Sequence, residues 1–469
     1  MQESNARRVT RKIAVSMAAQ VISLAVSFLL NLIVPKFISE YQYAYWQTFL
    51  LYVNYVGVLH FGLLDGIVLR YSQYDYDQLD KPLLRSQFHS LFLSNCLFAS
   101  VSVAIALILN AEITSEIVAL VGLGIITKNV FTYTSYTFQI TNRIGNYAIL
   151  VIAQRLIYGV AAGVLILLGV DNFVWYCLAD LLGDIAGIGI GLICNKDLYV
   201  GKSVSIRTAL QEMKRNLSSG IKLMVATWSS IMLVGLAKMM IQWRWDELVF
   251  GKVSFAFSVS NLFLTFVAAI SIVLFPSMKR MDPAELPKLY TSIRRASSPV
   301  LFGMLLFYFP GCWILEKWLP AYAPSLKYLG ILLPMIVFSS QVSLLTDNYL
   351  KAYRKEKTML FINLASIAFA AVFFILSAYV FESVELLLAS VVVAIMLRSM
   401  ASEWVVSKVI NIRLYGTFVK DFIMAAAFLV FVNYLSLWAA CVCYALSFLI
   451  YLLCSKNLTA RLFSNKNTK

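Results

Sequence analysis

The sequence predicts an all-helical integral membrane protein of about fourteen transmembrane helices, and three observations support this prediction. Hydrophobic residues make up 60% of the 469-residue chain, charged residues only 13%, and the mean hydropathy is +0.78. Soluble domains carry roughly 25% charged residues, so lipid is the expected solvent for most of this chain. Apolar runs of membrane-spanning length recur along the whole sequence, and basic residues gather in alternate connections between them.

Each predicted span has the roughly 20 mostly apolar residues that are needed to cross a hydrocarbon layer about 30 Å thick. The spans lie at about 13–35, 44–69, 88–110, 117–140, 147–170, 173–194, 219–241, 249–275, 298–319, 326–349, 358–380, 384–407, 417–434 and 436–454. The first run follows a basic segment, as in a signal peptide, but it is too long for one. We therefore expect it to be an uncleaved first span.

The distribution of basic residues predicts which connections lie in the cytoplasm. With the N-terminus inside, the cytoplasmic segments hold 30 of the 39 Lys and Arg residues, and the outer loops hold only Lys36, Arg244, Lys317 and Lys327. Cytoplasmic loops of membrane proteins are enriched in Lys and Arg, and a wrong span count would invert this bias from that point onward. Both termini are therefore predicted to be cytoplasmic. The net charge of +15 reflects topology, so nucleic acid is not an expected partner.

An internal repeat predicts two lobes. Residues 66–72 (GIVLRYS) and 271–277 (SIVLFPS) match at four of seven positions, and both segments close a span. Six spans separate the two segments, so the repeats are parallel. We expect a first lobe at 1–195, a cytoplasmic amphipathic linker at 196–218, a second lobe at 219–410, and two appended spans with a cytoplasmic tail at 411–469. In the linker, Ile206, Leu210, Met213 and Leu217 recur at helical spacing, as in a helix lying on the membrane surface.

Several charges fall within or at the ends of the predicted spans, where a charge costs roughly 3 kcal/mol or more. The cations are Lys128, Arg155, Lys238, Lys252, Arg398 and Arg70, and the acids are Asp65, Asp180 and Asp184. Such residues usually face a bundle interior or an aqueous cavity. The excess of cations favours a cavity that binds an anionic substrate, with phosphate-bearing groups as good candidates.

Structural roles explain some of these charges equally well. Lys238 and Lys252 lie toward the outer ends of their spans and can extend to the membrane surface. Arg155 can pair with Asp184, whereas Lys128 lies in the middle of its span and is the strongest candidate for the cavity. Asp180 and Asp184 share one helical face and could bind a proton or sodium ion, or could simply be neutralised there. Glycines at 183, 187 and 191 would let another helix approach that face.

The sequence lacks the motifs of membrane-associated enzymes and pumps. The closest approach to a phosphate-binding loop is Gly201-Lys202-Ser203, but Lys196 occupies the position of its leading glycine. The two histidines exclude a zinc-protease helix, and the seven cysteines fall in or beside apolar runs, so no metal site is expected. An enzyme is therefore not predicted, and no cofactor is expected other than a coupling ion.

Three segments resemble the polysaccharide-exporting branch of the multidrug/oligosaccharidyl-lipid/polysaccharide (MOP) transporter superfamily. They are residues 61–71 (FGLLDGIVLRY), 250–256 (FGKVSFA) and 272–280 (IVLFPSMKR), and the arrangement of six, six and two spans is also similar. The resemblance covers essentially the whole chain, although its motifs are degenerate.

The resemblance implies a flippase in the bacterial inner membrane that moves lipid-linked oligosaccharide. Its substrate would be an O-antigen or capsule repeat unit of polysaccharide biosynthesis on undecaprenyl pyrophosphate, moved by alternating access with H+ or Na+ as coupling ion. Expected partners are membrane lipid and polysaccharide polymerase or assembly proteins. The alternatives are a peptidoglycan lipid-precursor flippase and a drug/cation antiporter of the same superfamily. The antiporters usually have twelve spans and rely on buried acids to bind cationic drugs, whereas this chain has two more spans and an excess of buried cations.

Overall fold

The computed structural model describes residues 2–109, 112–278, 282, 285–412 and 415–464, and the regular elements in this part of the chain are all helices. The prediction of an all-helical protein is therefore confirmed. Contacts divide the chain into two compact units, Met1–Gly251 and Lys252–Lys469. The predicted lobes at 1–195 and 219–410 rest on span count and on the internal repeat, and that division stays a prediction.

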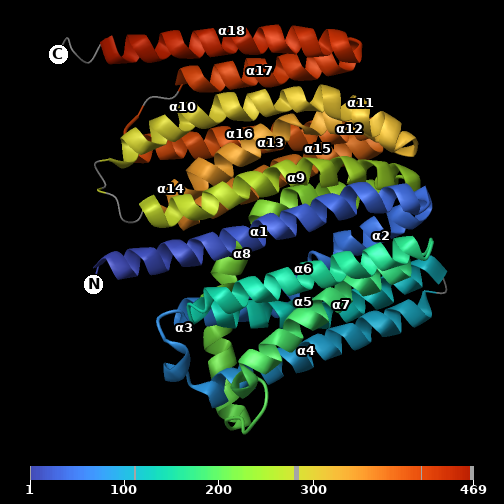
Figure 1. Ribbon diagram of the computed structural model, residues 1–469, viewed down its shortest axis with the longest axis vertical. Coiled ribbons are helices and arrows are strands. Elements are labelled where there is room, and N and C mark those ends of the chain that lie inside the picture. Colours follow the sequence, from blue (N-terminus) through green and yellow to red (C-terminus); the bar gives the residue numbers. More distant parts are fainter. Residues whose placement is uncertain (1, 110–111, 279–281, 283–284, 413–414, 465–469) are drawn as a thin grey trace. The chain divides into compact units, whose positions relative to one another are not determined.

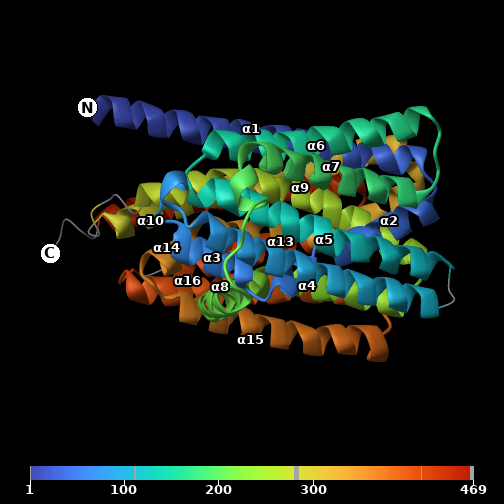
Figure 2. The ribbon, with the colours of Figure 1, turned by 90° about the horizontal axis from the view of Figure 1, so that it is seen from below.

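The first unit is a bundle built around one long central helix. Helix α5 contacts α2, α4, α6 and α7, and α1 packs on α6; these helices run alongside one another in Figures 1 and 2. The elements are α1 (Gln2–Phe37), α2 (Glu40–Val53), η1 (Val56–His60), α3 (Leu63–Tyr71), η2 (Tyr76–Gln78), α4 (Lys81–Ile108), α5 (Glu112–Ile140), α6 (Ile144–Leu167), α7 (Phe173–Cys194), η3 (Lys196–Leu198) and α8 (Ile206–Arg244).

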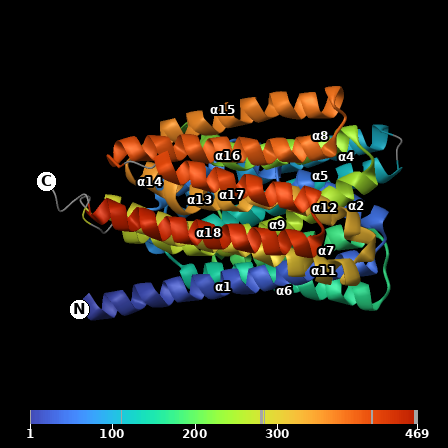
Figure 3. The same ribbon diagram turned by 90° about the horizontal axis from the view of Figure 1, so that it is seen from above.

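The second unit is also helical, and α16 is its central element. Helix α16 contacts α12, α13 and α15, and Figure 3 shows α17 beside α18 and α15 beside α16. The elements are α9 (Glu247–Met278), which begins in the first unit, α10 (Leu286–Met304), η4 (Leu305–Phe307), α11 (Tyr308–Trp318), η5 (Pro320–Tyr322), α12 (Ala323–Leu332), α13 (Pro334–Gln341), η6 (Val342–Thr346), α14 (Asp347–Ala352), α15 (Glu356–Ile375), η7 (Leu376–Val380), α16 (Val384–Val409), α17 (Tyr415–Tyr434) and α18 (Leu437–Ser464).

The helices agree with the predicted map of spans. Within the described residues, ten helices are long and apolar enough to cross a membrane, and two bent helix pairs raise this number to twelve. Two shorter apolar stretches, Val21–Phe37 in α1 and Leu437–Leu453 in α18, coincide with the predicted first and last spans. Fourteen spans are therefore compatible with the structure.

Local sequence signals explain where several helices begin. The Asp80 side chain accepts a hydrogen bond from the Leu83 backbone N–H at the start of α4, and Asn172 accepts one from Val174 at the start of α7. At the start of α8, Ser205 accepts a hydrogen bond from the Thr208 N–H. Short polar side chains at this position satisfy backbone donors that have no partner within the helix.

The second predicted span is broken, and α8 lies beside it from Tyr52 to Tyr71. The chain turns by 57° between η1 and α3, where Phe61 and Gly62 have φ angles of 50° and 86°. Helix α8 runs in the opposite direction beside this bent span. Its contacts lie at Tyr52 with Gln242, Tyr55 with Ile231, Gly62 with Gly220, and Tyr71 with Glu212.

Helices α3 and α8 approach so closely that their backbones are in direct contact. A Cβ atom on Gly220 would lie 2.0 Å from the carbonyl oxygen of Gly62, and one on Gly66 would lie 2.0 Å from that of Asn216. Real Cβ contacts are never this short, so glycine is required at both positions. Met213 and Leu217 of α8 then pack against the hydrophobic core of the first unit, which includes Leu63, Ile67 and Tyr133.

Residues 206–218 of the predicted linker form the first part of α8, after η3 and a short irregular stretch. This part runs across the direction of α4, α5 and α6, and Figure 2 shows it end-on. Ile206 and Leu210 are exposed, whereas Met213 and Leu217 are partly buried against the core. A helix that lies along a membrane surface would have this orientation; its assignment to the cytoplasmic surface stays a prediction.

Substituting Gly220 with Ala should destabilise the protein, because the new methyl group would collide with the backbone of α3. Overpacking of this kind typically costs about 1–3 kcal/mol. Gly189→Ala is a matched control on α7, where an added Cβ meets nothing within 4 Å, and Ala is normally the better helix former. Thermal unfolding of the purified protein, followed by loss of the monodisperse peak in gel filtration, measures both effects. Equal melting temperatures for the two variants would contradict the assigned contact.

Candidate functional site

A buried ion cluster in the first unit brings together three of the predicted site residues. The ammonium of Lys128, on α5, lies 2.7 Å from a carboxylate oxygen of Asp180 and 2.9 Å from one of Asp184, both on α7. The side chain of Asp184 has no exposed surface, and its second oxygen accepts a hydrogen bond of 2.6 Å from the amide of Gln154 on α6. Three helices of the first unit therefore meet at this cluster.

The glycines of α7 explain how the helices approach so closely. A Cβ at Gly183 would lie 2.6 Å from the carbonyl oxygen of Gln154, and one at Gly187 would lie 2.5 Å from the ring of Phe131. The small-residue face predicted from the sequence is thus the contact face. Asp180 and Asp184 share the side of α7 that carries these glycines, so they face α5 and α6.

Lys128 is neutralised by the two aspartates of the cluster and is not a free cation. One ammonium lies between two carboxylates, so the fully ionised group carries one negative charge. Asp184 is paired with Lys128 and Gln154, and no ion pair with Arg155 occurs in the described part of the chain. The predicted pairing of Arg155 with Asp184 is therefore replaced by one with Lys128, whose flexible stem reaches both carboxylates from the facing helix.

Polar contacts connect this cluster with the break in the second span. Asn129, next to Lys128 on α5, donates hydrogen bonds to the carbonyl oxygen of Val56 in η1 and to the side chain of Asn95 on α4. At the break, the His60 ring accepts a hydrogen bond from the Gly62 N–H and lies 3.8 Å from the carboxylate of Asp65. Asp65 is thus buried beside His60.

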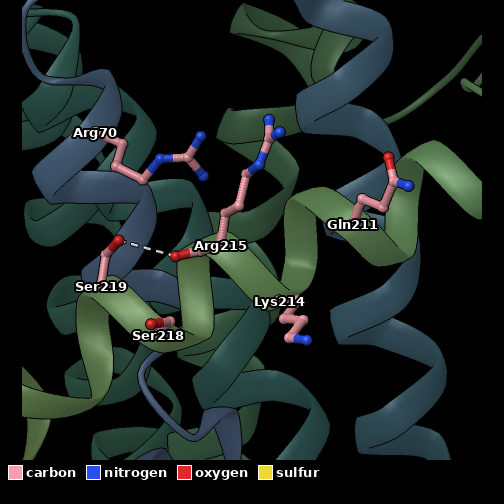
Figure 4. A pocket seen from close by; sticks show the side chains of 6 residues that line it. All are labelled: Arg70, Gln211, Lys214, Arg215, Ser218 and Ser219. Carbon is pink, nitrogen blue, oxygen red and sulfur yellow. Dashed lines mark hydrogen bonds between the residues drawn. The ribbon is translucent and has the colours of Figure 1, made fainter.

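A second charged site lies between α3 and α8. An open pocket of about 620 Å³ is lined by Arg70, Gln211, Lys214, Arg215, Ser218 and Ser219 (Figure 4). The Arg70 guanidinium donates hydrogen bonds of 2.5 Å to Glu212 and to Asn216. Arg70 is the one pocket residue that we predicted as a site residue. The others escaped the prediction because they lie in the predicted linker or at the first residue of the next span, where basic residues were taken to mark topology.

The remaining predicted cations lie elsewhere. Lys238, on α8, has its ammonium 5.8 Å from the centre of the Phe250 ring. Lys252 is the first residue of the second unit and is half-buried. Arg398 is buried on α16 in the second unit and interacts electrostatically with Asp347 on α14. Their predicted role in binding a substrate stays a prediction.

The second unit contains a buried ion cluster that sequence reasoning missed. The Arg294 guanidinium lies 2.9 Å from Glu403 and 2.7 Å from Asp421. Asp421 also accepts hydrogen bonds from Gln341 and Tyr451, so α10, α13, α16, α17 and α18 meet there. All three charged side chains are almost fully buried. Arg294 lies in the connection between the predicted spans 249–275 and 298–319, where basic residues were taken to mark topology. Glu403 and Asp421, acids within the predicted spans 384–407 and 417–434, are the signal that could have indicated a buried partner.

Comparisons with known proteins agree with this architecture. The family described as "Polysaccharide biosynthesis protein" matches residues 58–311. The fold is similar to that of a lipid II flippase, MurJ, in an inward closed conformation, with a TM-score of 0.67 and 11% identity over 96% of this chain and 100% of that one. No curated protein matches the sequence.

Two further solved structures have the same fold. An inward-facing multidrug resistance MATE family transporter of the MOP superfamily matches with a TM-score of 0.57 and 14% identity, over 84% of this chain and 98% of that one. A MOP superfamily transporter from Pyrococcus furiosus matches with a TM-score of 0.52 and 10% identity, over 85% of this chain and 95% of that one. At these identities the similarity concerns the fold.

Replacing Lys128 with Ala should destabilise the first unit, because it leaves two buried carboxylates without their cation. Breaking a buried ion pair from one side costs about 3–5 kcal/mol. Adding Asp180→Asn and Asp184→Asn to Lys128→Ala should recover much of the loss, whereas Arg155→Ala, on the neighbouring helix, should change stability far less. Thermal unfolding of the purified variants, compared in a mutant cycle, tests this coupling. Strictly additive effects would contradict the ion cluster.

Proposed function

The chain belongs to the polysaccharide biosynthesis protein family and has the fold of MOP transporters, and from this premise we propose that it is a flippase for lipid-linked oligosaccharide. Its substrates are undecaprenyl-pyrophosphate-linked repeat units of the O-antigen or capsule type. The protein moves them across the bacterial cytoplasmic membrane, with both of its termini on the cytoplasmic side. The prediction that it is not an enzyme agrees with its structural neighbours, which are transporters and flippases.

The observation that carries this proposal is the extent of the structural match. A lipid II flippase aligns with 96% of this chain, whereas a multidrug transporter of the same superfamily aligns with 84%. The chain therefore shares more of its length with a flippase than with a drug transporter. This difference supports a lipid-linked substrate over a cationic drug, and the family description supports a polysaccharide precursor.

Alternating access is the proposed mechanism. A transporter with two conformations exposes one central site first to one side of the membrane and then to the other. The polar part of the substrate crosses within the protein while its lipid tail stays in the bilayer. Polysaccharide polymerase and assembly proteins are the proposed partners that receive the product.

The Lys128 cluster supports coupling of transport to a proton gradient. Its three charges sum to one negative charge inside a membrane-spanning bundle, where unbalanced charge is expensive. Uptake of one proton by Asp180 or Asp184 would make the cluster neutral. The Lys128 ammonium already lies between the two carboxylates, at the position that a sodium ion would need, so the geometry favours H+ over Na+.

Deleting the gene should abolish surface glycan and cause lipid-linked repeat units to accumulate inside the cell. Surface glycan is measured by gel electrophoresis and staining, and the lipid-linked precursor by extraction and mass spectrometry. A deletion strain with normal surface glycan would overturn the proposed function. Accumulation of a peptidoglycan precursor, or sensitivity to cationic drugs with normal glycan, would instead identify one of the two alternatives.

Asp180→Asn should stop transport in the complemented deletion strain, because the cluster is then neutral without a proton and has no negative charge left to neutralise. Asp197→Asn is the matched control, since Asp197 pairs with Lys81 outside the cluster and is exposed. Membrane levels of both variants are compared by immunoblot, and in membrane vesicles transport is driven by either a pH or a sodium gradient. Normal transport by Asp180→Asn would contradict the coupling role, and dependence on sodium alone would contradict the choice of H+.

A further inference from the structure

We infer that the pocket between α3 and α8 binds the phosphate or diphosphate group of a membrane lipid. We call it the α3–α8 pocket; it comprises Arg70, Gln211, Lys214, Arg215, Ser218 and Ser219. The inference rests on the proposed function in one respect, namely that the lipid diphosphate is the substrate. The binding chemistry itself follows from the geometry of the pocket.

The pocket keeps an excess of positive charge. Three of its six lining residues are cations, Arg70, Lys214 and Arg215, and the acid Glu212 pairs with Arg70 and Arg215. The Glu212 carboxylate is buried and bonds to Arg70 and Tyr71, while Arg215 lies 3.7 Å from it. One buried negative charge therefore balances only part of three positive charges. This distinguishes the pocket from the two buried clusters, in which carboxylates outnumber cations.

Arg70 is held in a conformation suited to bind an anion. Glu212 and Asn216 both accept hydrogen bonds from the same terminal nitrogen of its guanidinium, Nη1. In the described part of the chain, Nη2 and Nε have no hydrogen-bond partner, and the side chain is 30% exposed. A guanidinium presents its donors in a rigid planar fork that matches phosphate oxygens. Because the fork is already fixed by the protein, little conformational entropy is lost on binding.

The remaining donors share one face of α8. Residues 211, 214, 215 and 218 recur at helical spacing and are exposed, whereas Glu212, Asn216 and Gly220 face α3 and are buried. In Figure 4 the guanidinium groups of Arg70 and Arg215 extend to the same side of α8, Gln211 lies further along the helix, and Lys214 extends to the other side. The Arg70–Arg215 pair is therefore the expected centre of the site, with Lys214 adding to its positive field.

The surroundings favour a phosphate that is attached to a lipid over one that is free in water. Leu69, next to Arg70, is 52% exposed, and Leu210, next to Gln211, is 51% exposed. Ile221 is also exposed beyond the far end of the pocket. The first part of α8, which carries Leu210, runs across the direction of α4, α5 and α6. Basic and apolar side chains combined in this way are typical of segments that bind anionic lipid at a membrane surface.

Binding of farnesyl diphosphate to the full-length protein in nanodiscs tests the inference, with inorganic pyrophosphate and farnesol as comparison probes. Arg215→Ala should weaken farnesyl diphosphate binding about tenfold or more, the size of the loss of a hydrogen bond to a charged group. Arg207→Ala is the matched control, because Arg207 is an exposed cation on the same helix that does not line the pocket. Equal binding by the two variants would overturn the site.

The three probes separate the sources of the phosphate. Farnesyl diphosphate should bind more tightly than pyrophosphate, farnesol should not compete, and Leu210→Ser should reduce the difference between the first two. Equal affinity for pyrophosphate and farnesyl diphosphate would overturn the lipid assignment in favour of a soluble phosphate. Competition by farnesol would overturn phosphate recognition.

The outcome is independent of the test of the proposed function. Binding is measured on the purified protein without transport, so it can succeed even if deletion of the gene leaves surface glycan intact. In the complemented strain, Arg215→Ala should lower surface glycan and Arg207→Ala should not. Normal export by an Arg215→Ala variant that has lost lipid diphosphate binding would overturn the link between this pocket and the substrate.

Discussion

The backbone contact between α3 and α8 is the constraint on which the first unit depends. Without side chains at Gly62, Gly66 and Gly220, the two helices approach until their backbones touch. This approach brings Arg70 and Tyr71 of one helix to Glu212 and Asn216 of the other. The contact also packs α3, the segment after the break in the second span, against α8. A bend of 57° interrupts the helix, so backbone polar groups there need partners outside the helix. A local requirement for small residues thus determines where a charged surface forms.

Each unit contains a buried cation that is paired with two carboxylates. The first unit holds one lysine between two aspartates, and the second holds one arginine between a glutamate and an aspartate. Cations buried in a bundle of membrane-spanning helices are stable there because acids neutralise them. In the second unit the arrangement has a structural consequence. Asp421 and Tyr451 bring α17 and α18 to Arg294, so the last two helices are attached to the unit through its buried charge.

Hydropathy and charge predicted the helices because a span must be long enough to cross the membrane and apolar where it meets lipid. Both requirements leave a pattern in the linear sequence. The partners of the charges depend on how helices face one another, which a linear pattern does not contain. Spacing placed Asp180 and Asp184 on one face, but it could not tell whether Arg155 or Lys128 lay opposite. The α3–α8 pocket was missed because Arg70 and residues 211–219 are distant in sequence. Its basic residues were also interpreted as a topology signal, because positive charge near the ends of spans is typical of cytoplasmic connections.

Two predicted roles for the first cluster, binding an anionic substrate and coupling to an ion, converge on one physical event. Lys128 cannot bind an anion while both of its carboxylate partners are ionised, since they satisfy its charge at 2.7 and 2.9 Å. Protonation of one aspartate weakens its ion pair with Lys128 and makes the ammonium more available to an anion. The protonation state of the two aspartates would therefore determine whether Lys128 can bind an anion. Proton binding and anion binding at this cluster would then be linked through one coupling free energy, which is how a coupled transporter connects its ion gradient to its substrate.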